Sequence, residues 1–150
     1  MPYTSRITYE AKRIHAAAVY CSDGRVGEHC DDFLMNGLKL PRYDRVALPG
    51  GPACLAGHTE AHLEEQGVID ELKFLVEAHG LKRIVLIQHE GCAFYAHRLG
   101  LTDDLLAAQQ RIDLLKAGNF IRRVIGLERI DCYYARIDGE AITFDPVKLK

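Results

Sequence analysis

Five side chains in two short motifs could together hold a metal ion and act on a substrate beside it. The first motif contributes Cys21, Asp23 and Arg25, and the second contributes His89 and Cys92. Two thiols and one imidazole form a typical donor set for zinc, which takes sulfur and nitrogen ligands in a tetrahedral shell. Three protein ligands leave a fourth position open, as in catalytic zinc sites. The two motifs therefore predict one zinc ion held by Cys21, His89 and Cys92.

Asp23 has two alternative roles beside such a metal. It lies two residues after Cys21, so its carboxylate could fill the fourth position and close the site. Alternatively, Asp23 could accept a proton from water at an open site, because two thiolates neutralise the zinc charge and weaken its effect on that water. A guanidinium binds a carboxylate bidentately, so Arg25 could hold Asp23 away from the metal. The sequence leaves both arrangements open.

Each of these signals, taken singly, has an ordinary structural explanation. A lone cysteine after a strand is usually a small buried apolar residue, and an Asp-x-Arg pair is usually a weak surface ion pair. We favour metal binding because the two motifs occur together and both follow predicted strands.

A second group of candidate ligands is formed by Cys54, His58 and His62, which would share one face if residues 55–65 were helical. A second metal could bind there, but we favour a partly buried polar helix face, from which a histidine could shuttle protons. The other polar or aromatic residues near the two motifs are interpreted as helix surface (His29, Cys30), pocket lining (Tyr95, His97) and core or dimer contact (Phe94).

The elements that must position these residues can be predicted from apolar runs and turn residues. Strands are expected at residues 13–20, 43–48, 83–88 and 129–137, and the turn Asp138-Gly139 leads to a return strand at 141–144. Apolar residues at helical spacing predict helices at 28–38, 67–79 and 102–117, the last ended by Gly118-Asn119. The sequence Pro49-Gly50-Gly51-Pro52 predicts a loop.

The alternation of strands and helices predicts an α/β fold. Its central sheet should be mostly parallel and flanked by helices, with an antiparallel strand at the C-terminal edge. Ligands of such sheets bind where the carboxyl ends of the strands meet. Cys21, the loop Pro49-Gly50-Gly51 and the motif from His89 to Cys92 each follow one of the first three strands. We therefore expect all three to meet at one edge of the sheet and form one site.

The bulk composition is that of an ordinary globular protein. The chain has 150 residues, 48% of them hydrophobic, which predicts a single domain spanning residues 1–150. A formal net charge of -2 gives no general attraction to nucleic acid, and no apolar run is long enough to cross a membrane. Five scattered cysteines, an odd number, and no visible secretory signal predict reduced thiols and a cytoplasmic location.

The two motifs resemble those of the β-class carbonic anhydrases. That family carries Cys-x-Asp-x-Arg after its first strand, matched here by Cys21, Asp23 and Arg25, and His-x-x-Cys after its third, matched by His89 and Cys92. The resemblance extends from about Ile14 to Gly100. It implies one zinc ion per chain, a homodimer or higher homo-oligomer, and reversible hydration of carbon dioxide to bicarbonate by metal-bound hydroxide. By the same resemblance, Asp23 would orient the hydroxide and Arg25 would keep Asp23 off the metal.

The chain departs from the family pattern around the substrate pocket, to which the resemblance assigns Gly50, Gly51 and Ala93. Ala93 stands where the family usually has glycine, Gln88 replaces a common glycine before His89, and the loop at residues 48–52 lacks an asparagine. Two alternatives to carbon dioxide hydration therefore stay open. One is a zinc hydrolase of a linear analogue such as carbonyl sulfide or carbon disulfide. The other is a non-catalytic zinc-binding dimer whose Cys₂-His-Asp site is closed.

Overall fold

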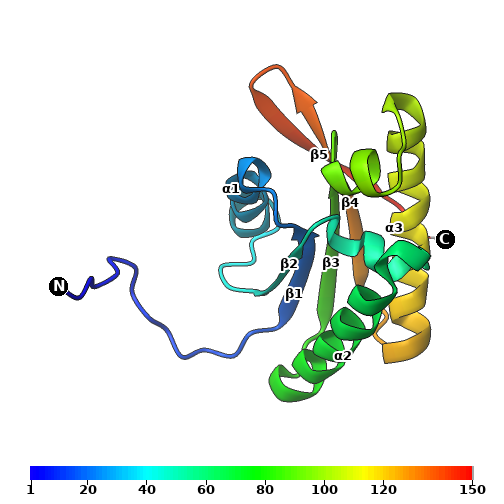
Figure 1. Ribbon diagram of the computed structural model, residues 1–150. Coiled ribbons are helices and arrows are strands. Elements are labelled where there is room, and N and C mark those ends of the chain that lie inside the picture. Colours follow the sequence, from blue (N-terminus) through cyan, green and yellow to red (C-terminus); the bar gives the residue numbers. More distant parts are fainter. Residues whose placement is uncertain (150) are drawn as a thin grey trace.

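The computed structural model describes residues 1–149, and its centre is a five-stranded sheet between two layers of helices (Figure 1). The strands are β1 (Ala16–Cys21), β2 (Asp44–Leu48), β3 (Arg83–His89), β4 (Ile130–Asp138) and β5 (Ala141–Val147). They stand in the order β2-β1-β3-β4-β5. All neighbours are parallel except β4 and β5, which pair antiparallel. The predicted α/β fold with its antiparallel edge strand is confirmed.

Helices cover both faces of this sheet (Figure 1). The three α-helices are α1 (Gly24–Asp32), α2 (His62–His79) and α3 (Asp103–Ile125). Helix α1 lies on one face, and α2 and α3 lie on the other (Figure 1). Short helical turns complete the layers: η1 (Phe33–Gly37), η2 (Gly51–Ala56), η3 (Thr59–Ala61) and η4 (Phe94–Arg98).

The two central strands, β1 and β3, are buried on both faces, which explains their nearly continuous apolar sequences. Successive side chains of a strand point to opposite faces, so each strand contributes to two cores. Val19 and Leu86 pack in the core under α2 and α3, whereas their neighbours Ala18 and Val85 pack in the core under α1. The two strands are thereby fixed firmly up to their carboxyl ends.

Helix α3 is longer than the sequence predicted, and the expected end at Gly118-Asn119 is wrong. The helix continues to Ile125 and ends at Gly126, which has a left-handed backbone. Gly118 serves packing instead, because a Cβ there would lie 2.7 Å from Cδ2 of Leu149. The glycine lets the end of the chain pass close to the helix, a contact far apart in sequence that a local pattern cannot reveal.

Other boundaries also differ from the predictions, and α2 begins at His62 rather than at residue 67. The helix expected at 28–38 begins earlier, at Gly24, because the Asp23 side chain accepts a hydrogen bond from the Arg25 amide and caps its first turn. The helix considered at residues 55–65 does not form: η2 ends at Ala56, the next residue Gly57 has a φ of 89°, and α2 starts at His62. The loop predicted at Pro49-Gly50-Gly51-Pro52 is a turn that enters η2 at Gly51.

The hairpin turn at Asp138-Gly139 joins β4 and β5 as predicted, and Gly139 supplies the positive φ of 63° that the turn needs. The return strand reaches Val147 rather than residue 144, and it includes Pro146, which an edge strand tolerates. Before β1, the first 15 residues extend away from the sheet as an irregular arm (Figure 1). None of the helices within residues 1–149 combines the length and apolar character that crossing a membrane requires.

Candidate metal centre

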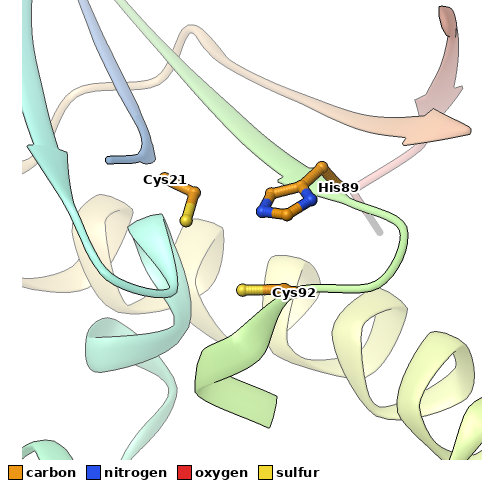
Figure 2. A group of neighbouring side chains, drawn as sticks. All are labelled: Cys21, His89 and Cys92. Atoms are coloured by element: carbon orange, nitrogen blue, oxygen red, sulfur yellow. The ribbon is translucent and has the colours of Figure 1, made fainter. Parts of the chain in front are cut away.

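The carboxyl ends of β1 and β3 bring the two motifs together. Cys21 is the last residue of β1, and His89 is the last residue of the adjacent parallel strand β3. The chain then turns at Gly91, which has a φ of 71°, and returns Cys92 toward the same point. Figure 2 shows the two sulfurs and the imidazole ring facing one another across a small gap. The expected convergence at one sheet edge is confirmed.

The three side chains are close enough to share one metal ion. One donor atom from each of Cys21, His89 and Cys92 lies within 4.8 Å of the other two. Zinc–sulfur and zinc–nitrogen bonds of about 2.3 and 2.0 Å place tetrahedral donors roughly 3.5–4 Å apart, so little movement is needed. His89 and Cys92 are buried and Cys21 is partly exposed. Within residues 1–149 this is the only group of such ligands.

The imidazole of His89 is arranged to offer its Nε2 lone pair. Its Nδ1 lies 2.9 Å from the carbonyl oxygen of Glu90, which accepts a hydrogen bond only if Nδ1 carries the proton. Nε2 is then an acceptor, and it is buried without a hydrogen-bond partner. A metal ion would satisfy that atom, and a backbone carbonyl on the opposite nitrogen is a common support for a metal-binding histidine. The donor set therefore fits zinc.

The two sulfurs differ in how readily they lose a proton. The adjacent Cys92 thiol lowers the pKa of Cys21, although burial opposes this effect. Interaction with Cys21 and burial raise the pKa of Cys92. Of the two sulfurs, Cys21 therefore loses its proton more readily, and the thiolate is the form that binds metal.

Backbone amides stabilise both sulfurs. The backbone N–H groups of Asp23 and Gly50 donate hydrogen bonds to Cys21. Those of Phe94 and Tyr95 donate to Cys92. Each of these contacts lowers the pKa of the thiol that accepts it. Glycine is required in the loop that supplies one of these donors. A Cβ on Gly51, whose φ is 52°, would lie 2.8 Å from the carbonyl carbon of Tyr20. The loop can therefore approach the end of β1 only because residue 51 has no side chain.

Asp23 is engaged with Arg25 through both of its carboxylate oxygens. Oδ1 accepts hydrogen bonds from the Arg25 amide at 2.9 Å and from Nε at 3.1 Å, and Oδ2 accepts one from Nη2 at 2.8 Å. These contacts lower the pKa of Asp23 to about 2, so the group is a carboxylate at neutral pH. Asp23 does not belong to the group of mutually close donors found within residues 1–149.

The residues expected to line a substrate pocket differ in their burial. Gly50 and Gly51 are buried, and a Cβ on Gly50 would lie 2.6 Å from the Phe94 ring. Ala93 is exposed at the start of η4. A role of Gly50, Gly51 and Ala93 in binding substrate stays a prediction.

The other candidate ligands are not part of the metal centre. The side chains of Cys54, His58 and His62 form no mutually close donor group, because the helix that would align them is broken at Gly57. His58 instead pairs with Asp113, at 2.6 Å between Nε2 and Oδ2. The remaining candidates are dispersed: His29 and His97 are exposed, Cys30 is buried in the core under α1, and Phe94 and Tyr95 are buried beside the site.

Sequence reasoning gave no supporting role to three polar residues that lie fully buried behind the centre. Gln88 is on β3, and Gln110 and Asp113 are on α3. A signal for the last two was available. They occupy positions between Leu106 and Leu114, on the face of α3 that turns toward the core. Polar residues at apolar positions of an amphipathic helix are expected to have specific partners.

Known structures define the class of fold. The chain is similar to β-carbonic anhydrase isoform I of the protozoan Trichomonas vaginalis, with a TM-score of 0.61 and 15% identity over 92% of this chain and 86% of that one. It is also similar to the β-carbonic anhydrase CafA of Aspergillus fumigatus, with a TM-score of 0.53 and 13% identity over 93% and 78% of the two chains. A tetrameric β-carbonic anhydrase from Sordaria macrospora gives a TM-score of 0.55 and 14% identity over 89% and 81%. The protein therefore has the β-carbonic anhydrase fold.

The sequence itself then identifies the family. A family model described as "Putative carbonic anhydrase" matches residues 11–133, which include both motifs. The chain belongs to this family. Among curated proteins, none matches the sequence.

Proposed function

We propose that this protein catalyses the reversible hydration of carbon dioxide to bicarbonate at a zinc ion held by Cys21, His89 and Cys92. The observation that carries the proposal is the buried, unpartnered Nε2 of His89, which lies within 4.8 Å of one donor atom on each cysteine. Family membership and fold support an enzyme of the carbonic anhydrase kind. A bound zinc ion supplies Lewis acidity, which makes water a nucleophile near neutral pH.

Asp23 is the residue that we assign to orient the nucleophile. Its Oδ1 accepts two hydrogen bonds, whereas Oδ2 accepts only one, from Arg25. A carboxylate oxygen has two lone pairs, so Oδ2 retains one for the O–H of an attacking water. Because its pKa is about 2, the carboxylate is available as an acceptor throughout the neutral range.

Arg25 is assigned to keep that acceptor in place. Its bidentate contact with Asp23 favours the arrangement in which the carboxylate is not a ligand and the fourth position is open. This observation supports catalysis over the alternative of a closed, purely structural Cys₂-His-Asp site. No comparable observation favours hydrolysis of carbonyl sulfide or carbon disulfide.

A homodimer or higher homo-oligomer is part of the proposal. One of the similar structures, a β-carbonic anhydrase of Sordaria macrospora, is described as tetrameric. In this chain Tyr3, Ile7 and Tyr9 of the N-terminal arm are at least 84% exposed, which leaves apolar surface for another subunit. Analytical ultracentrifugation at several protein concentrations will give the oligomeric state. A monomer at all of these concentrations would contradict the proposed oligomer. The cytoplasmic location stays a prediction.

Stopped-flow measurement of carbon dioxide hydration, with zinc content determined on the same sample, tests the proposed activity. We expect about one zinc per chain and hydration that is lost with the metal. Sulfide release from carbonyl sulfide and carbon disulfide should be measured in parallel. Full zinc occupancy without carbon dioxide hydration at alkaline pH would overturn the proposal, and sulfide release by that sample would identify the hydrolase alternative.

A further inference from the structure

A fully buried polar network lies behind the metal centre, between β3 and α3. Its members are Gln88, Tyr95, Gln110 and Asp113, and each has a relative exposure of 0%. Buried polar groups weaken a fold unless they are hydrogen-bonded, and a buried carboxylate needs several partners. The placement of four such groups together therefore requires an explanation beyond the filling of a core.

Asp113 is the anchor of this network. Its Oδ2 accepts a hydrogen bond from the Tyr95 hydroxyl at 2.7 Å and lies 2.6 Å from Nε2 of His58. Its Oδ1 accepts a hydrogen bond from the side-chain amide of Gln109 at 2.8 Å. Tyr95 in turn accepts from Nε2 of Gln88 at 3.0 Å. The Asp113 carboxyl group thus contacts polar groups from three separate parts of the chain.

The network reaches each of the three candidate ligands by a different route. Gln110 donates to the backbone carbonyl of His89 at 2.7 Å. Tyr95 carries one of the amides that donate to Cys92. Gln88 donates to the carbonyl of Gly50 at 3.1 Å, and the amide of that glycine donates to Cys21. One helix, α3, therefore sets the relative positions of ligands that come from β1, β3 and the following turn.

We propose that Asp113 and Gln110 are positioning residues for the metal, holding Cys21, His89 and Cys92 in a ligating arrangement before the ion binds. The inference rests on the metal centre assigned under the proposed function. Ligands already in place lose little conformational freedom on binding, so affinity rises when the supporting hydrogen bonds are intact. Gln88 stands at one of the departures from the family motif, and the network gives that departure a structural role.

The variant Asp113→Asn tests the proposal with almost no change in volume. An amide has one accepting oxygen and one donating nitrogen, so whichever way it turns, a donor of the network faces the –NH₂ group. We expect zinc affinity, measured by competition with a chromophoric chelator, to fall about 10–100-fold. The thiolate-to-metal and d–d bands of the Co²⁺-substituted protein should also shift, which a loss of stability alone would not cause.

The matched control is Asp44→Asn. Asp44 also pairs with a histidine at 2.6 Å, through Nδ1 of His79, but it lies at the first residue of β2, the end of the sheet away from the metal centre. This variant should keep wild-type zinc affinity and the wild-type Co²⁺ spectrum. Both variants should be measured at a temperature well below their own melting temperatures.

If Asp113→Asn does not fold, Tyr95→Phe serves in its place, since it removes one hydroxyl and keeps the ring. Weaker zinc binding and an altered Co²⁺ spectrum are expected for it too, with a smaller change. If the folded Asp113→Asn protein keeps the wild-type zinc affinity and Co²⁺ spectrum, this inference alone is overturned. The same result for Tyr95→Phe would overturn it where Asp113→Asn does not fold. A wild-type protein that binds no zinc would overturn the metal centre itself and the inference with it.

Discussion

Arg25 holds Asp23 by both oxygens of its carboxylate, at 3.1 Å from Nε to Oδ1 and 2.8 Å from Nη2 to Oδ2. The Arg25 side of this contact is in solvent, with 83% of the side chain exposed, whereas the Asp23 side chain is 17% exposed. An exposed ion pair contributes little to stability. Its value therefore lies in geometry, since it fixes where the Asp23 carboxylate can point.

Replacing Arg25 by alanine should release Asp23 and close the site. We expect Arg25→Ala to keep its zinc while carbon dioxide hydration falls roughly 10²-fold or more, because the orienting acceptor is lost. Stopped-flow rates and zinc content should be measured together. Arg136→Ala removes a comparable exposed guanidinium–carboxylate pair, with Asp145, away from the site and should hydrate at the wild-type rate. A fully active Arg25→Ala protein would refute the role given to Arg25.

Replacing Asp23 by asparagine should separate its chemical role from its structural one. Asparagine caps a helix as well as aspartate does, so α1 and the melting temperature should be almost unaffected. The amide cannot act as an anionic acceptor, and we expect kcat to fall about 10²–10⁴-fold with zinc retained. Asp32→Asn, at the other end of α1, provides the control. Loss of zinc from Asp23→Asn would instead indicate that Asp23 is a ligand.

Removing a ligand sulfur should remove the metal. Cys21→Ala is expected to bind far less than one zinc per chain after dialysis against a chelator, because two protein ligands hold the ion poorly. Cys30→Ala is the matched control, since that thiol is on the buried face of α1 and lies outside the donor group. Zinc content by elemental analysis distinguishes the two. One zinc per chain in Cys21→Ala would show that the ligands are assigned wrongly.

The close approach of the loop at Gly51 to β1 can be tested by two glycine substitutions. Gly51 and Gly57 both have positive φ, of 52° and 89°, but only at Gly51 would a Cβ meet the backbone at the end of β1. Both alanine variants carry backbone strain of roughly 1–3 kcal/mol. Gly51→Ala should lose further unfolding free energy and weaken zinc binding, because it displaces the strand end that bears Cys21. Equal effects of the two substitutions on zinc affinity would contradict this account.

The sequence allowed the sheet, the motifs and their meeting point to be predicted, because each depends on local patterns and on the rule that parallel strands end at one edge. The features that the sequence did not reveal depend on contacts between residues that are far apart in the chain. Helix α3 runs through Gly118, against which Leu149 packs, whereas a glycine at that place in a helical pattern usually indicates an end. The roles of Gln110 and Asp113 were hidden for the same reason, since their partners come from β3 and from the segments that flank it.

X-ray absorption at the zinc edge of the wild-type protein tests the metal centre most directly, because it counts the ligand atoms of each kind. The account predicts two sulfurs at about 2.3 Å, one imidazole nitrogen at about 2.0 Å, and one further light atom in the first shell. A shell with fewer or more than two sulfurs, or without an imidazole, would contradict the assignment of Cys21, His89 and Cys92.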